Sequence, residues 1–185
     1  NRKFGIVQFL ENQNCESIIG QEVTLSAQIK ADSNLSNVRM AIISWSGSTK
    51  DAPTKDIVSA WENSSTNPTL VSDMTYENTP SDLSVGTSFS KHSVSATVDI
   101  SSTKNIAIFI WSNSTGTTVG DKLHIGQVQL EQASSASDFP FENYSSQFLK
   151  CARYFRGWLE TSDSSANETA IAQGHNVGTT ASRIQ

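Results

Sequence analysis

The feature that most constrains the fold of this chain is a strict alternation of apolar and polar residues. Val23, Leu25, Ala27 and Ile29 alternate with polar side chains over seven consecutive positions. Because successive side chains of an extended strand point to opposite faces, these four apolar residues share one face. The segment therefore predicts a strand with one face in a hydrophobic core and the other in water.

The same reasoning predicts further strands. Residues 89–100 alternate in the same way, whereas residues 38–45 and 105–111 are apolar almost throughout. Such continuous apolar runs are typical of central strands that are covered on both faces. Ile42 and Ile108 are therefore expected to point into the core.

Two less regular strands are predicted near the ends of this region. Residues 3–10 are mostly apolar and are expected to form a largely buried first strand. Residues 122–131 alternate except at Gly126 and Gln127, where the phase shifts as it does at a β-bulge. This second strand is expected to close the domain.

Composition favours an all-β fold. Ser and Thr account for 47 of the 185 residues, while the strong helix formers Ala, Leu, Glu and Lys are scarce. Six or seven strands at these spacings predict a two-sheet antiparallel β-sandwich. Residues 46–80 form a long polar excursion between two strands, and long ordered loops are often functional.

The sandwich is expected to occupy residues 1–142. Pro140 cannot donate a hydrogen bond to a sheet, so it marks an edge or an exit from the domain. Phe139 and Phe141, which flank Pro140, are expected to tuck their rings under the sheet.

The pattern changes beyond this point. Residues 143–160 predict a short helix, capped by Ser145 or Ser146, and then a connecting strand. Residues 161–185 predict a polar linker and a partial β-unit that begins with a strand at 170–177. Because the chain lacks an initial Met and ends inside such a unit, we expect a piece of a longer protein.

Cys15 and Cys151 are the only cysteines in the sequence. Two cysteines do not make a disulfide framework, and the preferred interpretation is two separate buried thiols. A bridge that clamps the first strand to the exit helix is the alternative.

Charge and the length of the apolar runs argue against two broad classes of partner. The chain has 18 acidic and 13 basic side chains, giving a formal charge of −5, whereas a general nucleic-acid binder needs clustered Lys and Arg. No apolar run approaches the ~20 residues of a membrane helix. We therefore expect neither nucleic-acid binding nor membrane insertion.

Catalytic motifs are absent from the sequence. Nothing places His92, His124 or His175 beside a nucleophile and a carboxylate, and no phosphate loop or metal-binding motif occurs. A glycosidase would need two converging carboxylates, and solvated loop acids are the preferred interpretation of those in the excursion. These acids are Asp51, Asp56, Glu62, Asp73 and Glu77. We expect no enzyme activity, cofactor or metal.

Four aromatic residues at strand ends or in loops are candidate ligand contacts. Sugar rings present apolar C–H faces that stack on aromatic side chains, while nearby Asn, Asp, Ser and Thr can meet the hydroxyl groups. Trp61 and Tyr76 lie in polar surroundings and are the stronger candidates. Trp45 and Trp111 are weaker candidates because they can instead fill the core.

Several short segments occur in a defined order along the chain. They are Gly5-Ile6-Val7-Gln8, Asn14-Cys15, Gly20-Gln21, Ala41-Ile42-Ile43-Ser44-Trp45, Ile108-Phe109-Ile110-Trp111-Ser112, Val128-Gln129-Leu130-Glu131, Phe139-Pro140-Phe141-Glu142, and Leu149, Cys151 and Arg153-Tyr154-Phe155. Together they resemble a module frequent in tail and fibre proteins of bacteriophages, over about the first 155 residues. The sequence departs at Ala133, where the family usually has glycine. The resemblance implies a jelly-roll related to carbohydrate-binding modules and an adhesin-like role, without fixing a ligand.

The helix region carries a second candidate site. Phe148, Leu149, Tyr154 and Phe155 follow directly after the sandwich, whose polar outer faces offer little apolar surface to cover them. Phage modules of this kind are usually parts of homotrimers, so the resemblance implies that these residues form an oligomer contact. An internal brace under the sandwich is the alternative.

The expected function is therefore a non-enzymatic module of a phage virion. It would have a structural role and bind a host-surface glycan or other virion proteins. One alternative is a carbohydrate-binding accessory domain of a secreted glycoside-active enzyme. Another is a purely structural virion linker that binds no sugar.

Overall fold

The computed structural model describes residues 3–32, 35, 37–51, 56–63, 65–114, 119–154, 174–176 and 182–184. The chain divides into two units, Asn1–Phe139 and Pro140–Gln185. The first unit contains β1 (Phe4–Phe9), α1 (Asn12–Cys15), β2 (Glu22–Ala31), β3 (Val38–Trp45), β4 (Val58–Ala60), β5 (Thr69–Leu70), β6 (Met74–Tyr76), β7 (Ser90–Thr97), β8 (Asn105–Ser112) and β9 (Leu123–Glu131). The second contains α2 (Tyr144–Tyr154), β10 (Gly174–Asn176) and β11 (Ser182–Ile184).

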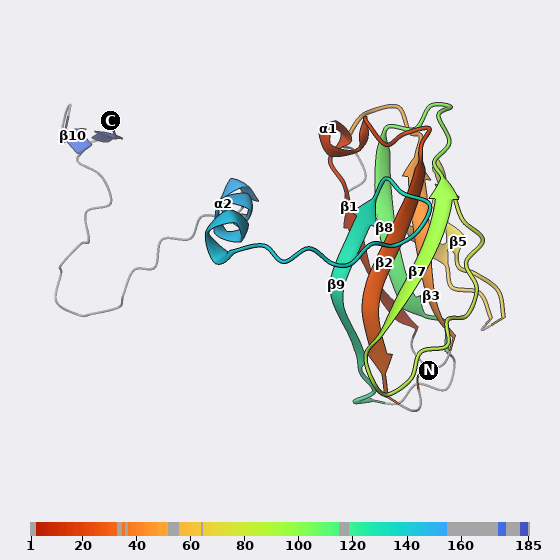
Figure 1. The fold of residues 1–185 in the computed structure, drawn as a ribbon. Helices are drawn as coiled ribbons and strands as arrows, with labels where there is room; N and C mark the ends of the chain where they lie inside the picture. The colour runs from red at the N-terminus through yellow and green to blue at the C-terminus, as the bar shows by residue number, and fades with distance from the viewer. Residues whose placement is uncertain are drawn as a thin grey trace. The chain divides into compact units, whose positions relative to one another are not determined.

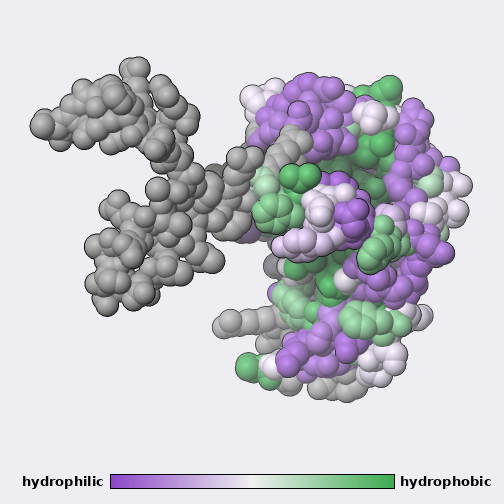
Figure 2. Space-filling view, turned by 60° about the vertical axis from the view of Figure 1, so that its left-hand side comes forward, coloured by the Kyte–Doolittle hydropathy of each residue, from purple (hydrophilic) through white to green (hydrophobic). Residues whose placement is uncertain are grey.

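Two antiparallel sheets form the first unit (Figure 1). One has the strand order β1-β8-β3-β6 and the other β7-β2-β9, while β4 and β5 form a small separate pair. This arrangement confirms the predicted all-β antiparallel sandwich. The jelly-roll topology stays a prediction. On the face drawn in Figure 2, hydrophilic residues predominate, with apolar patches between them.

The main core lies between the two sheets. Alternate residues of β2, including Val23, Leu25 and Ile29, meet alternate residues of β3 and β8 there. Ile42 and Ile108 are cross-strand partners in the register, and both are buried in this core. The predicted inward orientation of both side chains is confirmed.

A second apolar cluster lies on the opposite face of the four-stranded sheet. It contains Ala41 and Ile43 of β3 together with Ala107, Phe109 and Trp111 of β8. The excursion at residues 46–80 covers it with apolar side chains, namely Ile57, Val58, Leu70, Val71, Met74 and Tyr76. Because both faces of β3 and β8 are buried, their sequences are apolar almost throughout, as predicted for central strands.

The first strand differs from the prediction. β1 pairs with β8 along one edge and is the last strand of its sheet, so its outer edge has no strand partner in the described part of the chain. Phe4, Ile6 and Val7 are consequently exposed, Ile6 to 53 %. The prediction of a largely buried strand was wrong because apolar content does not distinguish an edge strand from a central one.

The bulge predicted in the closing strand is confirmed. The register between β2 and β9 shifts between Ser26 and Gln28, where Gln127 and Val128 of β9 lie opposite Ala27 alone. Gln127 has a left-handed backbone with φ 48°, an uncommon conformation for a residue with a side chain.

The exit from the sandwich was only partly predicted. The first unit ends at Phe139, close to the boundary at residue 142 expected from the sequence. Phe139 is 45 % exposed, so its ring is only partly covered, and Phe141 belongs to the second unit.

The second unit contains the predicted short helix. Its cap is Asn143 rather than Ser145 or Ser146: the Asn143 side chain accepts a hydrogen bond from the Ser146 backbone N–H at 2.9 Å. β10 lies within the strand predicted at 170–177 and pairs with β11. The connecting strand predicted at 156–160 lies outside the described residues. Neither helix in the described part of the chain has the length and hydropathy of a membrane span.

The two cysteines are separate thiols. Cys15 is the last residue of α1 and is buried, and its Sγ–H donates to the Asn12 carbonyl at 3.4 Å. Cys151 is also a free thiol, but it is exposed rather than buried as expected. The bridge considered from the sequence is not formed.

The core positions give a direct test of the strand phasing. Ile42→Ala and Ile108→Ala are each expected to lower the free energy of unfolding by ~2 to 5 kcal/mol, because truncation leaves a cavity between the sheets. Ile6→Ala is the matched control and should cost less than about 1 kcal/mol, because Ile6 is half exposed. Urea denaturation measures all three; near-zero losses for both core variants would contradict the inward orientation.

Candidate ligand-binding site

Four aromatic rings form a row on the outer cluster of the four-stranded sheet. Phe109 and Trp111 are two residues apart on β8, so they share a face, and their rings stack at 4.4 Å with an interplanar angle of 11°. Tyr76 of β6 lies 6.3 Å from Trp111 at one end. Trp61, which follows β4, lies 6.2 Å from Phe109 at the other end. We call these four residues the aromatic row.

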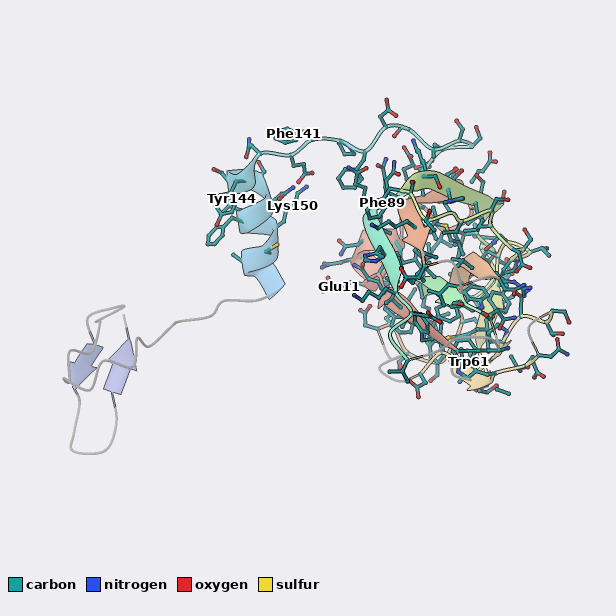
Figure 3. The ribbon with its side chains drawn as sticks, turned by 90° about the horizontal axis from the view of Figure 1, so that it is seen from below. Glu11, Trp61, Phe89, Phe141, Tyr144 and Lys150 are labelled. Atoms are coloured by element: carbon teal, nitrogen blue, oxygen red, sulfur yellow. The ribbon has the colours of Figure 1, made fainter. Side chains whose placement is uncertain are left out.

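The row brings together three of the four aromatic residues proposed from the sequence. Trp111 is fully buried, so it occupies the core position that the sequence left open as an alternative. The Tyr76 hydroxyl donates to the Pro68 carbonyl at 2.9 Å, and burial raises the pKa of Tyr76 to about 12. Trp61 is 42 % exposed and is the ring of the row that a ligand in solution can reach. Figure 3 shows Trp61 at the periphery of the first unit.

Trp45 packs against the same cluster but is held in a structural role. Its indole N–H donates to the Thr49 carbonyl at 3.1 Å. Gly47 lies against the ring so closely that a Cβ at this position would stand 2.0 Å from a ring carbon. The Trp45 ring is therefore packed against its own loop rather than open to a ligand.

Sequence reasoning did not select Phe109, the residue that supports Trp61. Phe109 lies within a run of apolar residues and is buried. The signal that could have found it is the spacing of two residues to Trp111, which places both rings on one face of the strand.

Polar contacts fix the loop that carries Trp61. The Asn113 side chain, which is fully buried at the end of β8, donates to the carbonyls of Thr66 at 2.8 Å and Asn63 at 3.2 Å. The ammonium group of Lys3 donates to Asn113 Oδ1 at 2.9 Å and to the Glu62 carbonyl. The residues that directly follow Trp61 are thus tied to Lys3, just before β1, and to Asn113, just after β8.

The loop itself is also ordered locally. Asn63 Oδ1 accepts hydrogen bonds from the Ser65 backbone N–H at 3.0 Å, the Ser65 hydroxyl at 2.6 Å and the Thr66 hydroxyl at 3.1 Å. Glu62 Oε1 accepts from the Thr69 hydroxyl at 2.8 Å. These contacts form a compact polar turn of the Asx type directly beside the exposed ring.

An ion pair between a buried arginine and a more exposed aspartate supports the same end of the sheet. Arg39 is almost fully buried, and its Nε–H donates to Asp82 Oδ1 at 2.6 Å. Its guanidinium also donates to Asn67 Oδ1 at 2.7 Å, while Asn37 donates to Asp82 Oδ2 at 2.6 Å. Arg39 therefore ties both ends of the segment from residue 67 to residue 82 to β3.

Burial and neighbouring charged or polar groups shift the pKa values of Lys3 and Asp82. Burial, and then the charge of Arg39, lower the pKa of Lys3 more than the Glu62 carboxylate raises it. Burial alone would raise the pKa of Asp82, but the hydrogen bonds from Arg39 and Asn37 outweigh it and hold the pKa below its ordinary value.

The carboxylates of the excursion have separate contacts. Asp51 Oδ1 accepts from the Asn12 backbone N–H at 2.7 Å and from the Asn105 amide at 2.6 Å, so it anchors the start of α1. Glu77 Oε2 accepts from the Asp99 N–H at 2.9 Å. Asp73 lies in a left-handed turn, with φ 64°, and its carbonyl accepts from Ser46. Asp56 lies just before β4 and is exposed.

The histidines occupy different environments. His92 Nε2 lies 2.8 Å from the Ser90 hydroxyl, and burial lowers the pKa of His92. His124 on β9 forms a T-shaped ring pair with Phe89, and His175 lies in β10 of the other unit. Among the described residues, no three His, Cys, Asp or Glu side chains are grouped as metal ligands would be.

Comparison with known proteins does not extend these observations. The chain matches no protein-family model, and searches of curated proteins and of solved structures returned no match.

The ion pair leads to a prediction about stability and pH. Asp82→Asn should lower the free energy of unfolding at pH 7, because it leaves the buried Arg39 charge uncompensated. Since the folded pKa of Asp82 is depressed, the carboxylate stabilises the fold at neutral pH, and this contribution is lost as pH falls through the ordinary Asp range toward the folded pKa. The difference in the free energy of unfolding between the wild type and Asp82→Asn should therefore become smaller as the pH is lowered.

The control for this prediction is the exposed ion pair between Lys50 and Glu16. Glu16→Gln should change the stability at pH 7 by no more than about 0.5 kcal/mol, because exposed pairs contribute little. Urea denaturation of both variants at several pH values makes the comparison. Equal effects of the two substitutions at pH 7 would show that the Arg39–Asp82 pair has no special role.

Proposed function

We propose that this domain is a non-enzymatic sugar-binding and structural module of a phage virion, of the tail-fibre or adhesin type, that contacts glycans on the host surface. The observation that carries the sugar-binding part is the exposed Trp61 ring. The phage assignment rests on the order of the sequence segments that resemble tail and fibre modules.

Trp61 has the properties of a stacking platform for a sugar ring. Its exposed face offers apolar surface to the C–H groups of a pyranose, and contact with Phe109 limits how far the indole can move. A rigid aromatic loses little conformational entropy on binding, which favours affinity.

Polar groups suitable for hydroxyl recognition lie around the same ring. Residues 62, 63, 65 and 66 supply carbonyl, amide and hydroxyl groups, and Lys3 adds a cation beside Glu62. Asn113 and Lys3 fix this turn through hydrogen bonds to its backbone carbonyls. Its polar groups therefore have defined positions before a ligand binds.

The absence of a catalytic role is also a proposal. It is supported by the separate structural contacts of Asp51, Glu62 and Glu77, because glycoside hydrolysis needs two carboxylates that converge on one bond.

We further propose that α2 assembles the protein into a homotrimer. Tyr144 and Phe148 lie one turn apart and stack at 6.1 Å, and Phe148 and Leu149 are exposed to 58 % and 71 %. Adjacent large apolar side chains at this exposure mark an association surface. The side chains of Tyr154 and Phe155, also proposed from the sequence, lie outside the described residues.

Removal of the platform should abolish most sugar binding. Trp61→Ala is expected to weaken binding to host-surface polysaccharide by about tenfold or more, because the stacked ring supplies most of the apolar contact. Affinity electrophoresis in gels that contain the polysaccharide measures the effect. Phe141→Ala, which removes an exposed ring outside the sandwich, is the control and should bind like wild type. Equal retardation of all three proteins would contradict the role of Trp61.

The same polysaccharides test the absence of hydrolysis. Their chain length should not change during incubation with the protein. Shortening that disappears on substitution of a carboxylate in the excursion, such as Asp56 or Glu62, would instead identify an enzyme.

Assembly through α2 predicts a change in oligomeric state. Phe148→Ser combined with Leu149→Ser should convert a trimer to a monomer and leave the sandwich folded, because the sandwich has a core of its own. Light scattering gives the mass, and circular dichroism reports the fold. Gln147→Ser on the same helix is the control. A wild-type chain that is already monomeric at micromolar concentration would exclude this proposal.

A further inference from the structure

A second candidate site lies on the other sheet, where the chain leaves the sandwich. After β9, residues 132–139 fold back across the outer face of the three-stranded sheet (Figure 1). We call this segment the strap. The Thr24 hydroxyl donates to the Ala133 carbonyl at 2.7 Å, and the Ser95 hydroxyl donates to the Ser134 carbonyl at 3.3 Å. The strap is thus fixed to β2 and β7.

Two charged side chains hold the far part of the strap. Lys91 of β7 donates to the carbonyls of Ala136 and Ser137. The carboxylate of Glu131 accepts from the Ser137 hydroxyl at 2.7 Å and from its backbone N–H at 2.8 Å, and these bonds lower the pKa of Glu131. The strap therefore has a defined position over the sheet.

A pocket of about 230 Å³ lies between the strap and the sheet. It is lined by Ser26, Ala27, Gln28, Lys91, Gln127, Asp138 and Phe139. The lining comes from β2, β7, β9 and the strap together, so the pocket depends on the folded arrangement of all four segments.

The β-bulge contributes directly to this pocket. The extra residue of the bulge is Gln127, whose left-handed backbone lies beside the point where the β2–β9 register shifts. A residue with a side chain adopts this conformation at some cost in energy, and such positions are frequent at binding sites. Here the bulge adds an amide to the pocket wall.

The groups that line the pocket have unused hydrogen-bonding capacity. The side-chain amides of Gln28 and Gln127 make no hydrogen bond within the described part of the chain. Beneath the strap, Gln129 pairs with Ser26 in the register, and its Oε1 is buried without a partner there. Each amide can both donate and accept, as recognition of hydroxyl groups requires.

The remaining lining residues decide the class of ligand. Lys91 and Asp138, whose Nζ and carboxylate oxygen lie 3.8 Å apart, give the lining one charge of each sign and no net charge, which favours a neutral ligand. Phe139 is 45 % exposed and gives the pocket one aromatic ring. A pocket of this volume lies below the ~300 to 1,000 Å³ of typical drug-sized sites, which limits the occupant to one small ring.

We propose that this pocket is a second saccharide subsite, which binds one neutral sugar ring stacked on Phe139 with its hydroxyls on Gln28 and Gln127. This inference deepens the proposed function and rests on it, but it uses different residues on a different sheet. Figure 3 shows Phe89, which directly precedes β7, well apart from Trp61.

Phe89 extends the subsite along the same face. Lys30 follows Gln28 at a spacing of two residues, so both lie on the outer face of β2. The Lys30 ammonium lies 5.0 Å from the centre of the Phe89 ring, which is exposed and forms a T-shaped pair with the His124 ring at 6.4 Å. This second ring would receive the neighbouring unit of a glycan whose first unit fills the pocket.

The test is a nuclear magnetic resonance titration of the ¹⁵N-labelled full chain. Glucose, galactose, mannose and N-acetylglucosamine are added separately to millimolar concentration, and backbone amide shifts are followed. At least one of these sugars should cause saturable shifts at residues 26–28, 91, 127 and 139. Phe139→Ala should weaken that binding by about three- to tenfold, through loss of the stacked ring.

Two variants separate the subsite from the Trp61 site and from a folding defect. Gln127→Gly keeps the left-handed backbone while removing the amide, so the bulge should persist and the affinity at the pocket should fall. Trp61→Ala should leave the pocket shifts unchanged. Phe141→Ala, just beyond the strap, is the control for Phe139→Ala.

Each outcome distinguishes the two claims. Shifts confined to the Trp61 loop would overturn the subsite and leave the proposed function intact. Pocket shifts that disappear in Phe139→Ala would support the subsite. If Trp61→Ala also has no effect on polysaccharide binding, Trp61 has no part in the proposed function. No saturable shift with any of the four sugars would overturn the subsite.

Discussion

The structure depends on the burial of one sheet on both of its faces. β3 and β8 contribute alternate side chains to the core between the sheets and the intervening side chains to the cluster on the other side. A sandwich with only two layers would leave that second set in water. The 46–80 excursion therefore stabilises the fold, because it removes the outer apolar cluster from water. The aromatic row lies in the cluster that this third layer creates.

Polar anchors make the third layer specific. Apolar contacts alone would not fix the register of a segment with such short strands, since the β4–β5 pair contains only a few residues. Arg39, Asn113 and Asn105 instead place buried hydrogen-bonding groups at the margins of the cluster, and each reaches a particular loop. A buried polar group without its partner is costly, so these contacts select one loop arrangement over others that would bury similar apolar area.

The sequence predicted the parts of the fold that depend on local pattern. Alternation identified β2 and β7, continuous apolar runs identified β3 and β8 as central, and a phase shift located the bulge at Gln127. What failed depends on partners that local pattern does not encode. β1 is as apolar as a buried strand, yet it lies at an edge, and Asn143 rather than a nearby Ser caps α2. The strap shows why such contacts escape local pattern: Thr24 and Ala133, which form one of its anchors, are 109 residues apart.

For the candidate site, three of the four predicted aromatic rings lie in one row. Their exposure differs, because it depends on which rings the folded excursion covers.

The bulge and the strap together form the two walls of one pocket. A regular β9 would present its side chains in strict alternation, and the outer face beside Gln28 would then be a flat polar surface. The extra residue at Gln127 interrupts that alternation and raises an amide from the sheet on one side. The strap, fixed by Lys91 and Glu131, forms the opposite wall with Phe139. A concave site thus arises on a sheet face from one inserted residue and one returning segment, and both walls depend on β9, the strand that closes the sandwich. Because the strap continues directly into Pro140 and the second unit, a ligand bound there would contact the last residues of the first unit.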